Sequence, residues 1–252
     1  MRNVLPLTSH VLAKPLFVSF FVLESCFMNN TIKPLIAEFI GTFALVFIGV
    51  LAIQGVNIVQ APNGLANLTS IGLAHGLTIA VMMAALGADS GGHFNPAVTS
   101  AFMATGRMNP ITGGLYIVAQ LAGASAAGLL ITGLFSAQIT GGGTPALAPQ
   151  VSATSGVILE AIGTFFLVLV FFGSAVDERA PKNVFPLVIG LTMAVDVMAL
   201  GPLTGGAVNP ARTFGSALAS GMWSNHIIYW VGPIVGGVLA GLVQNFVLME
   251  RK

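Results

Sequence analysis

The sequence predicts an all-α membrane protein with six transmembrane helices, two re-entrant half-helices and an inverted internal repeat. Three observations lead to this fold: the composition, six long apolar segments, and a punctuated phrase that occurs twice. Of the 252 residues, 55% are hydrophobic and only 7% are charged, whereas soluble domains average about 25% charged residues. So few charges leave long stretches that are compatible with the interior of a lipid bilayer.

Six apolar segments are each long enough to cross about 30 Å of hydrocarbon as a helix. They lie near residues 33–57, 66–87, 111–135, 154–176, 184–202 and 225–248. Together they define a membrane domain at 33–248. An N-terminal cytoplasmic extension is expected at 1–32, where the apolar core is too short to span, and a cytoplasmic tail is expected at 249–252.

The nine basic residues predict the orientation of the chain. With six spans and both termini in the cytoplasm, eight of the nine fall on the cytoplasmic side, as the positive-inside rule requires. We therefore expect a multi-pass protein of the cell membrane. The ninth basic residue, Arg212, lies where a loop has to enter the membrane, and an arginine at that depth indicates a functional site.

The repeated phrase is LGADSGGHFNPAVTSA at 86–101 and LGPLTGGAVNPARTFG at 200–215. When residues 76–97 are aligned with 190–211, 13 of the 22 positions are identical without a gap. The segment AEFIGTF is echoed in the same way by LEAIGTFF, which aligns Glu38 with Glu160.

Each half of the chain, 33–135 and 154–248, therefore holds three spans and one phrase. Because three is odd, the second half enters the bilayer from the opposite side, which is the inverted-repeat architecture of many transport proteins.

The Asn-Pro-Ala letters of each phrase predict the start of a short helix. Asn is a favoured N-cap and Pro a favoured first helical residue. The two helices would begin at the triplets Asn95, Pro96, Ala97 and Asn209, Pro210, Ala211. Each is long enough only to reach the middle of the membrane, so two positive helix ends would meet there and oppose cations. A single Asn-Pro can equally be a turn, but two copies at equivalent places of an inverted repeat disfavour that reading.

The residues around these triplets are candidates for the wall of a passage. Glycine backbone can pack closely against a cavity, and irregular backbone is tolerated at membrane depth where it lines one. The predicted lining residues are Gly91, Gly92, His93, Gly205 and Ala207. Glu38 and Glu160 lie inside spans, and we expect them to accept hydrogen bonds from the re-entrant loops rather than to carry protons.

On these residues the chain resembles the aquaporins of the major intrinsic protein family, over about residues 33–248. The resemblance rests on two intact Asn-Pro-Ala motifs, the repeated Glu-x-x-Gly-Thr element and the sequence NPAR. It implies a passive channel domain in the lipid bilayer, one pore per subunit of a homotetramer, and no cofactor.

Other classes of protein fit the sequence poorly. A net charge of +1 gives no basic surface for nucleic acid, and the single Cys26 excludes a cysteine-based metal cluster. The phrases hold no nucleophile–base pair, so we expect no enzyme, and no metal site is expected. The neutral asparagines at the membrane centre favour a passive pore over an alternating-access transporter.

The resemblance also locates a selectivity filter, at His75, Val197, Gly206 and Arg212. This combination is similar to plant vacuolar-type aquaporins that pass water and ammonia. Two small residues widen the opening, while the other two keep it polar. We expect a channel for water, ammonia and other small neutral solutes that excludes protons and ions.

The alternative is a facilitator of glycerol and small polyols. Facilitators of that kind resemble one another in an Asp after the second NPAR and a Lys four residues later, where this chain has Thr213 and Ala217. Asp196 departs from the pattern, because its repeat counterpart is Met82. It either packs against a neighbouring helix or tunes the filter beside Val197.

Overall fold

The computed structural model describes residues 31–58, 64–136, 141 and 143–250. Six of its helices are long and apolar enough to cross a membrane. They are α2 (Lys33–Ile58), α3 (Gly64–Ser90), α5 (Pro110–Leu134), α7 (Ala153–Phe171) extended by η2 (Phe172–Val176), α8 (Phe185–Thr204), and α10 (Ile228–Val243) extended by η3 (Gln244–Leu248).

Two short helices, α4 (Pro96–Ala104) and α9 (Pro210–Ser220), each begin inside one copy of the repeated phrase. The described ranges contain helices, turns and loops but no strand. The predicted all-α membrane fold is confirmed, and the chain is a multi-pass membrane protein. Most of the expected extension, residues 1–30, and residues 251–252 of the expected tail lie outside the described residues. The domain boundaries therefore stay a prediction.

The sixth spanning helix begins three residues later than predicted, at Ile228 rather than 225. Residues 224–227 form turns instead, with hydrogen bonds from His226 N to Trp223 O and from Ile228 N to Asn225 O. Asn225 has a φ of 54°, which interrupts a right-handed helix. The apolar residues that follow do not predict this turn.

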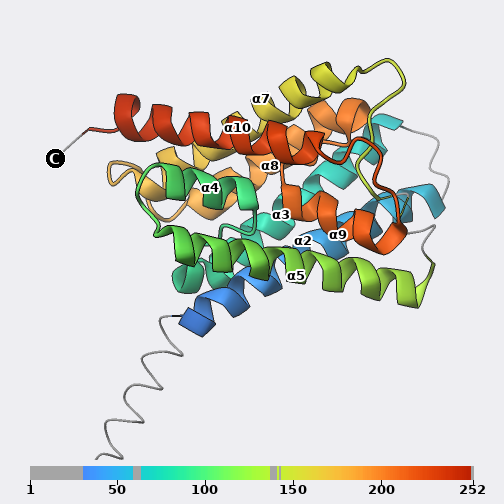
Figure 1. Ribbon diagram of the computed structural model, residues 1–252, viewed down its shortest axis with the longest axis horizontal. Coiled ribbons are helices and arrows are strands. Elements are labelled where there is room, and N and C mark those ends of the chain that lie inside the picture. Colours follow the sequence, from blue (N-terminus) through green and yellow to red (C-terminus); the bar gives the residue numbers. More distant parts are fainter. Residues whose placement is uncertain (1–30, 59–63, 137–140, 142, 251–252) are drawn as a thin grey trace, which may run out of the picture.

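The two half-helices enter from opposite ends of the bundle (Figure 1). Helix α4 lies toward the end where the described chain begins and finishes, called here the termini side, and α9 lies toward the opposite end, the far side. Helix α4 packs against α10 and α9 packs against α5, so each half-helix rests on a spanning helix of the other half. The two halves therefore interlock around the place where the half-helices meet.

Helices α3 and α8 cross at two glycines that the sequence repeat makes equivalent. A Cβ atom on Gly76 would collide with the carbonyl oxygen of Gly190, and a Cβ atom on Gly190 would collide with that of Gly76. Each glycine also faces an equivalent alanine, Ala194 or Ala80. Small residues allow membrane helices to approach this closely, and their reciprocal contacts follow the inverted repeat.

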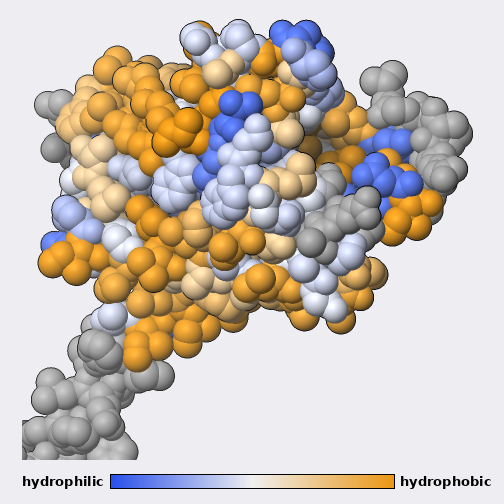
Figure 2. Space-filling view, turned by 45° about the vertical axis from the view of Figure 1, so that its right-hand side comes forward, coloured by the Kyte–Doolittle hydropathy of each residue, from blue (hydrophilic) through white to orange (hydrophobic). Residues whose placement is uncertain are grey.

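The outside of the bundle is apolar, as Figure 2 shows for much of the visible face. Large hydrophobic side chains project outward from several spanning helices, among them Ile36, Ile40, Leu77, Val81 and Ile158. A soluble monomer rarely exposes a continuous apolar surface of this kind. The exposure follows from burial in lipid.

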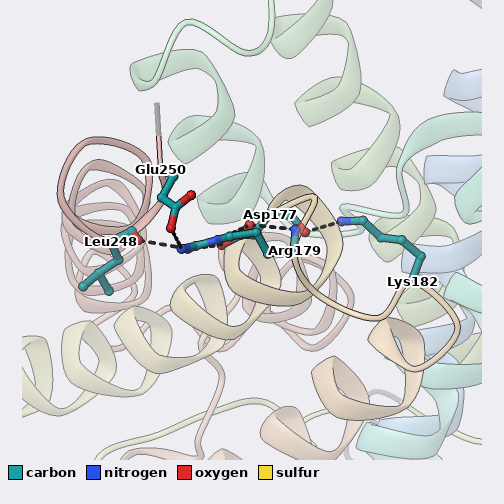
Figure 3. Close-up of polar contacts among 5 residues, drawn as sticks. All are labelled: Asp177, Arg179, Lys182, Leu248 and Glu250. Atoms are coloured by element: carbon teal, nitrogen blue, oxygen red, sulfur yellow. Dashed lines mark hydrogen bonds and ion pairs between the residues drawn. The ribbon is translucent and has the colours of Figure 1, made fainter. Parts of the chain in front are cut away.

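A cluster of polar side chains lies at the termini side of the bundle (Figure 3). Arg179 donates to Asp177 Oδ2 at 2.7 Å, to Glu250 Oε1 at 3.2 Å and to the carbonyl of Leu248 at 3.0 Å. Lys182 Nζ donates to the carbonyl of Asp177 at 2.6 Å. The Arg179 guanidinium lowers the pKa of the Asp177 carboxyl to about 2. These contacts tie the loop after η2 to the end of η3.

Candidate functional site

The two half-helices meet at their N-termini, where each asparagine caps its own helix and donates a hydrogen bond to the other half of the chain. Asn95 Oδ1 accepts from the N–H of Ala97 at 2.8 Å, and its Nδ2 donates across the interface to the carbonyl of Val208 at 2.8 Å. Each cap thus starts its own helix and also holds the loop of the other half.

The second asparagine repeats this arrangement. Asn209 Oδ1 accepts from Ala211 N at 3.0 Å and from Arg212 N at 3.3 Å, and Asn209 Nδ2 donates to the carbonyl of Phe94 at 2.9 Å. Pro96 and Pro210 take the first helical positions. An amide group carries two N–H bonds, and only one of each pair is used here. The remaining N–H of each asparagine is available to the narrow cavity that both residues line.

The loops before the caps adopt a backbone that L-residues rarely take. Positive φ angles occur at Gly91, Gly92, Gly205 and Gly206, and also at Phe94 (47°) and Val208 (42°). A positive φ at a β-branched residue such as valine costs about 1–3 kcal/mol and persists only where its surroundings enforce it. Here it turns the carbonyl groups of Phe94 and Val208 toward the asparagines that bind them.

Two buried carboxylates enforce this backbone. Glu38 accepts from Ser90 Oγ at 2.7 Å, His93 N at 2.9 Å, Phe94 N at 2.6 Å and Gln120 Nε2 at 2.7 Å. His93 and Phe94 belong to the first re-entrant loop, the segment from which Glu38 is expected to accept hydrogen bonds. The loop N–H groups are therefore paired with protein rather than left open to a cavity.

Glu160 holds the second loop in the same manner but with fewer donors. It accepts from Thr204 Oγ1 at 2.6 Å, Ala207 N at 3.1 Å and Val208 N at 2.7 Å. The position equivalent to Gln120 is Pro233, which has no side-chain donor. The two supports are thus related by the repeat but are not equal.

On the termini side of the asparagines the passage is narrow and largely apolar. A cavity of about 20 Å³ lies there, which is room for about one water molecule at a time. Besides Gly92, His93 and the two asparagines, it is lined by Leu45, Ile79, Met83, Val98, Leu167, Phe171, Ile189 and Met193. A molecule in this cavity would have few polar partners other than the asparagines and His93.

The hydrogen bonds around Thr99 assign the proton of His93. Thr99 Oγ1 accepts from Gln120 Nε2 at 2.9 Å and donates its only hydrogen to the carbonyl of Asn95 at 3.2 Å. With this orientation of the hydroxyl, His93 Nδ1, at 3.1 Å from the same oxygen, is assigned as the donor of that pair, and its Nε2 then keeps a lone pair. The ring packs against Phe102, with centroids 4.3 Å apart, which fixes its orientation.

On the far side a wider cavity of about 280 Å³ reaches Arg212, Val197 and Gly205. Arg212 is only 3% exposed, and its Nη2 lies 3.5 Å from Nε2 of His75. Its Nη1 has no hydrogen-bond partner in the described part of the chain. A buried guanidinium N–H without a partner suits a solute that accepts a hydrogen bond.

The other two predicted filter residues lie against each other on this side. A Cβ atom on Gly206 would lie 3.1 Å from the Cα atom of Val197, so only glycine fits beneath this helix without displacement. Val197 and Arg212 line the same cavity. The structure thus brings His75 to Arg212 and Gly206 to Val197 at the far-side mouth.

Several polar residues of the site were missed from the sequence. Tyr116 donates to the carbonyl of Ser90 at 3.1 Å, and Tyr229 donates to the carbonyl of Thr204 at 2.7 Å. The repeat could have indicated them, because the two tyrosines are the first residues of the equivalent segments YIVAQLAGASAAGL and YWVGPIVGGVLAGL. Gln120 carried no comparable signal, because its partners Glu38 and Thr99 lie 82 and 21 residues away in the sequence.

The described residues hold no cluster of three or more His, Cys, Asp or Glu side chains arranged to bind a metal ion. The polar groups of the site are instead donors and lone pairs spaced along a passage. Such an arrangement can bind small neutral molecules in sequence, but it offers no nucleophile that a general base activates.

Comparison with known proteins places these features in a family context. Residues 26–244 match the family model described as major intrinsic protein. Aquaporin TIP4-4 of Zea mays is 42% identical over 225 residues, covering 87% of this chain and 88% of that protein. Aquaporin TIP2-1 of Arabidopsis thaliana is 39% identical, covering 92% and 94%.

A relative from a microbe and a solved structure extend the comparison. Aquaporin AqpM of Methanothermobacter thermautotrophicus is 39% identical, covering 88% of this chain and all 100% of its own length. The X-ray structure of the aquaglyceroporin from Plasmodium falciparum superposes with a TM-score of 0.75 at 26% identity, covering 86% of this chain and 96% of that one.

Proposed function

The chain belongs to the major intrinsic protein family and is therefore a passive channel for small solutes rather than an enzyme, and we propose that it conducts water and ammonia while it excludes ions and protons. The observation that carries this proposal is the meeting of Asn95 and Asn209 at the N-termini of two opposed half-helices. Both positive helix ends face the passage, and so do the unused amide donors. A neutral molecule with a lone pair is stabilised there, whereas a cation meets a positive potential.

The far-side mouth supports the choice of solutes. Arg212 contributes a permanent charge and an unpaired donor, and His75 contributes a lone pair at Nε2, since its Nδ1 donates to the carbonyl of Ile71 at 2.9 Å. Val197 and Gly206 occupy little space on the other wall. A polar mouth with two small residues admits water and ammonia, and it discriminates by charge more than by size.

Purified protein in liposomes provides the test. Vesicles that contain the protein should shrink under an osmotic gradient much faster than empty vesicles, with a low activation energy, and should take up ammonia faster at an unchanged proton leak. Shrinkage that does not exceed that of empty vesicles would contradict the proposal for water, and uptake equal to that of empty vesicles would contradict it for ammonia.

A matched pair of variants tests the filter itself. Val197→Phe adds a ring at the far-side mouth and should lower ammonia uptake and water flow several-fold. Leu191→Phe adds the same ring on the lipid-facing side of the same helix, where Leu191 is 43% exposed, and should change neither. Equal effects of the two substitutions would place the filter elsewhere.

The second candidate is a facilitator of glycerol and small polyols. The structural similarity to the aquaglyceroporin from Plasmodium falciparum favours it. The residues Thr213 and Ala217, where such facilitators resemble one another in Asp and Lys, favour water instead. Glycerol uptake by the same vesicles separates the two: uptake as fast as that of ammonia would replace the first proposal by the second.

We also propose that the termini side faces the cytoplasm and that the protein is a homotetramer with one pore in each subunit. The orientation is supported by four basic residues on the termini side: Lys33 at the start of α2, Arg107 in the loop after α4, and Arg179 and Lys182 in the loop after η2. A protease site added after Lys252 should be cleaved only in inside-out vesicles. Crosslinking in membranes followed by mass determination tests the tetramer.

A further inference from the structure

A cavity of about 450 Å³ lies on the termini side of the bundle, apart from the passage between the half-helices. It is lined by the loop after α4, by the end of η2 with the loop that follows, and by η3 with the residues after it. None of its lining residues also lines the narrow cavity or the far-side cavity. Its volume lies in the range of about 300–1,000 Å³ that is typical of ligand pockets.

The wall of this termini-side cavity carries charges of both signs. The charged lining residues are two bases and three acids: Arg107, Arg179, Asp177, Glu178 and Glu250. Arg179 and Asp177 are bonded mainly to each other, since both carboxylate oxygens of Asp177 accept from the guanidinium (Figure 3). These two residues therefore belong to the wall, and a ligand has to be bound by the others.

Arg107 is the base of the cavity whose donors remain open. Its Nε donates to Asn245 Oδ1 at 2.7 Å, which holds the side chain against η3. Its Nη1 and Nη2 atoms carry four further N–H bonds, and these have no partner within the described residues. A guanidinium with free N–H groups binds a phosphate in a bidentate manner.

Glu250 supplies the opposite charge at the same cavity. Its Oε1 accepts from Arg179 Nη1 at 3.2 Å, and its Oε2 is not bonded to any described residue. An ammonium group fits a carboxylate of this kind, because it carries three N–H donors and a positive charge. With three acids against two bases, the wall disfavours a ligand that is only anionic.

The termini-side cavity continues into the apolar outer surface of the bundle. Phe246 lines the cavity and is also 49% exposed, and the next residue of η3, Val247, is 73% exposed. Exposed apolar side chains on a spanning helix face the acyl chains of the bilayer. A molecule that fits this place has a charged end in the cavity and an apolar end along η3, and a phospholipid has this form.

We propose that the termini-side cavity binds the headgroup of a zwitterionic phospholipid. The phosphate binds Arg107, the ammonium group binds Glu250, and the acyl chains lie along Phe246 and Val247. An ethanolamine headgroup is preferred to choline, because the choline nitrogen has no N–H donor for the carboxylate. The site is independent of the solute that the passage conducts.

Native mass spectrometry of the full chain in detergent, after removal of lipid, provides the test. Phosphatidylethanolamine should bind several-fold more tightly than phosphatidylcholine or phosphatidylglycerol. Arg107→Gln removes the donors to the phosphate and should weaken the binding of phosphatidylethanolamine roughly ten-fold. Lys33→Gln removes the same charge on the same side but outside the cavity, so it should bind this lipid as the wild type does.

Glu250→Gln tests the recognition of the ammonium group. It should weaken the binding of phosphatidylethanolamine and strengthen that of phosphatidylglycerol, because an acid that repels the anionic lipid is lost. A merely structural role of the cavity wall would change the binding of both lipids in the same direction. This change of preference decides the question even if Arg107→Gln does not fold.

Three results would overturn the inference. They are equal binding of the three lipids by the wild type, equal binding of phosphatidylethanolamine by Arg107→Gln and the wild type, and displacement of the lipid by inorganic phosphate. The last result would assign the cavity to a free phosphate in place of a lipid. Each of them leaves the proposed water conduction untouched, because that activity is measured separately in vesicles.

Discussion

The Nη2 atom of Arg212 lies 3.5 Å from the Nε2 atom of His75, beside the far-side cavity that Arg212 lines. Because His75 Nδ1 donates to the carbonyl of Ile71, its Nε2 faces the guanidinium with a lone pair. The pair joins α3 of the first half to α9 of the second, which are 137 residues apart. It places a fixed positive charge beside the far-side cavity, and this charge is the basis of the first prediction.

Arg212→Val should weaken the exclusion of cations while water flow persists. Valine is the residue that stands at the equivalent place of the first phrase, Val98, so the substitution makes the two half-helices alike at this position. Loss of the charge lowers the electrostatic barrier to cations, and potassium and proton leak should rise several-fold. Flux assays on vesicles measure both, with Arg107→Val on the termini side as the control. Unchanged leak in Arg212→Val would refute the role of its charge.

Gly206→Ala should destabilise the fold. A Cβ atom there would lie 3.1 Å from Gly201 N and 3.1 Å from Val197 Cα, and the residue has a φ of 55°. The positive φ alone costs an L-residue about 1–2 kcal/mol. Gly114→Ala in α5, where a Cβ atom meets nothing within 4 Å, is the matched control and should not destabilise. Thermal unfolding in detergent compares the two, and equal stability would contradict the close approach.

Glu38→Gln should be more harmful than Glu160→Gln. Each oxygen of Glu38 accepts from two donors, so either orientation of a glutamine sets its NH₂ group against two N–H or O–H groups. At Glu160 one oxygen accepts only from Val208 N, so the NH₂ group opposes a single donor. The expected losses of unfolding free energy are about 2–4 kcal/mol for Glu38→Gln and about 1–2 kcal/mol for Glu160→Gln.

Denaturant unfolding in detergent measures these losses, and Glu250→Gln, whose side chain is 80% exposed, provides the control. The reverse order of Glu38→Gln and Glu160→Gln would show that the count of donors does not govern the strength of the support.

The polar cluster of the termini side should respond to acid. Arg179 lowers the pKa of Asp177 to about 2, below the ordinary value of about 3.9 for an aspartate. A group whose pKa is lowered in the folded state contributes stability that is present above the unfolded pKa and is lost as the pH falls through the folded one. The contribution of this pair should therefore be constant down to about pH 4 and disappear between about pH 4 and about pH 2.

Melting temperatures of wild type and Arg179→Gln over this range test the assignment. The difference between the two proteins should shrink as the pH falls through the window, and a difference that is independent of pH would contradict it. Lys182 contacts the carbonyl of Asp177 rather than its carboxylate, so Lys182→Gln should keep most of the acid dependence.

The sequence by itself determined the architecture of this protein. Six apolar segments, two copies of one phrase and an odd number of spans in each half require an inverted repeat, because lipid excludes unpaired backbone and sets the length of a spanning helix. The helix starts at Asn95 and Asn209 followed from the same letters, since capping is a local property of Asn and Pro.

Only the tertiary structure decided how the two halves hold each other. The carbonyl partners of the asparagines, Val208 and Phe94, are 113 and 115 residues away from them, and no local pattern reveals such a bond. The unequal support of Glu38 and Glu160, and the place of Asp196 behind Gly206, likewise depend on which helices cross. Spacing along a chain predicts which groups share an element, but the distances between groups on different elements follow from packing.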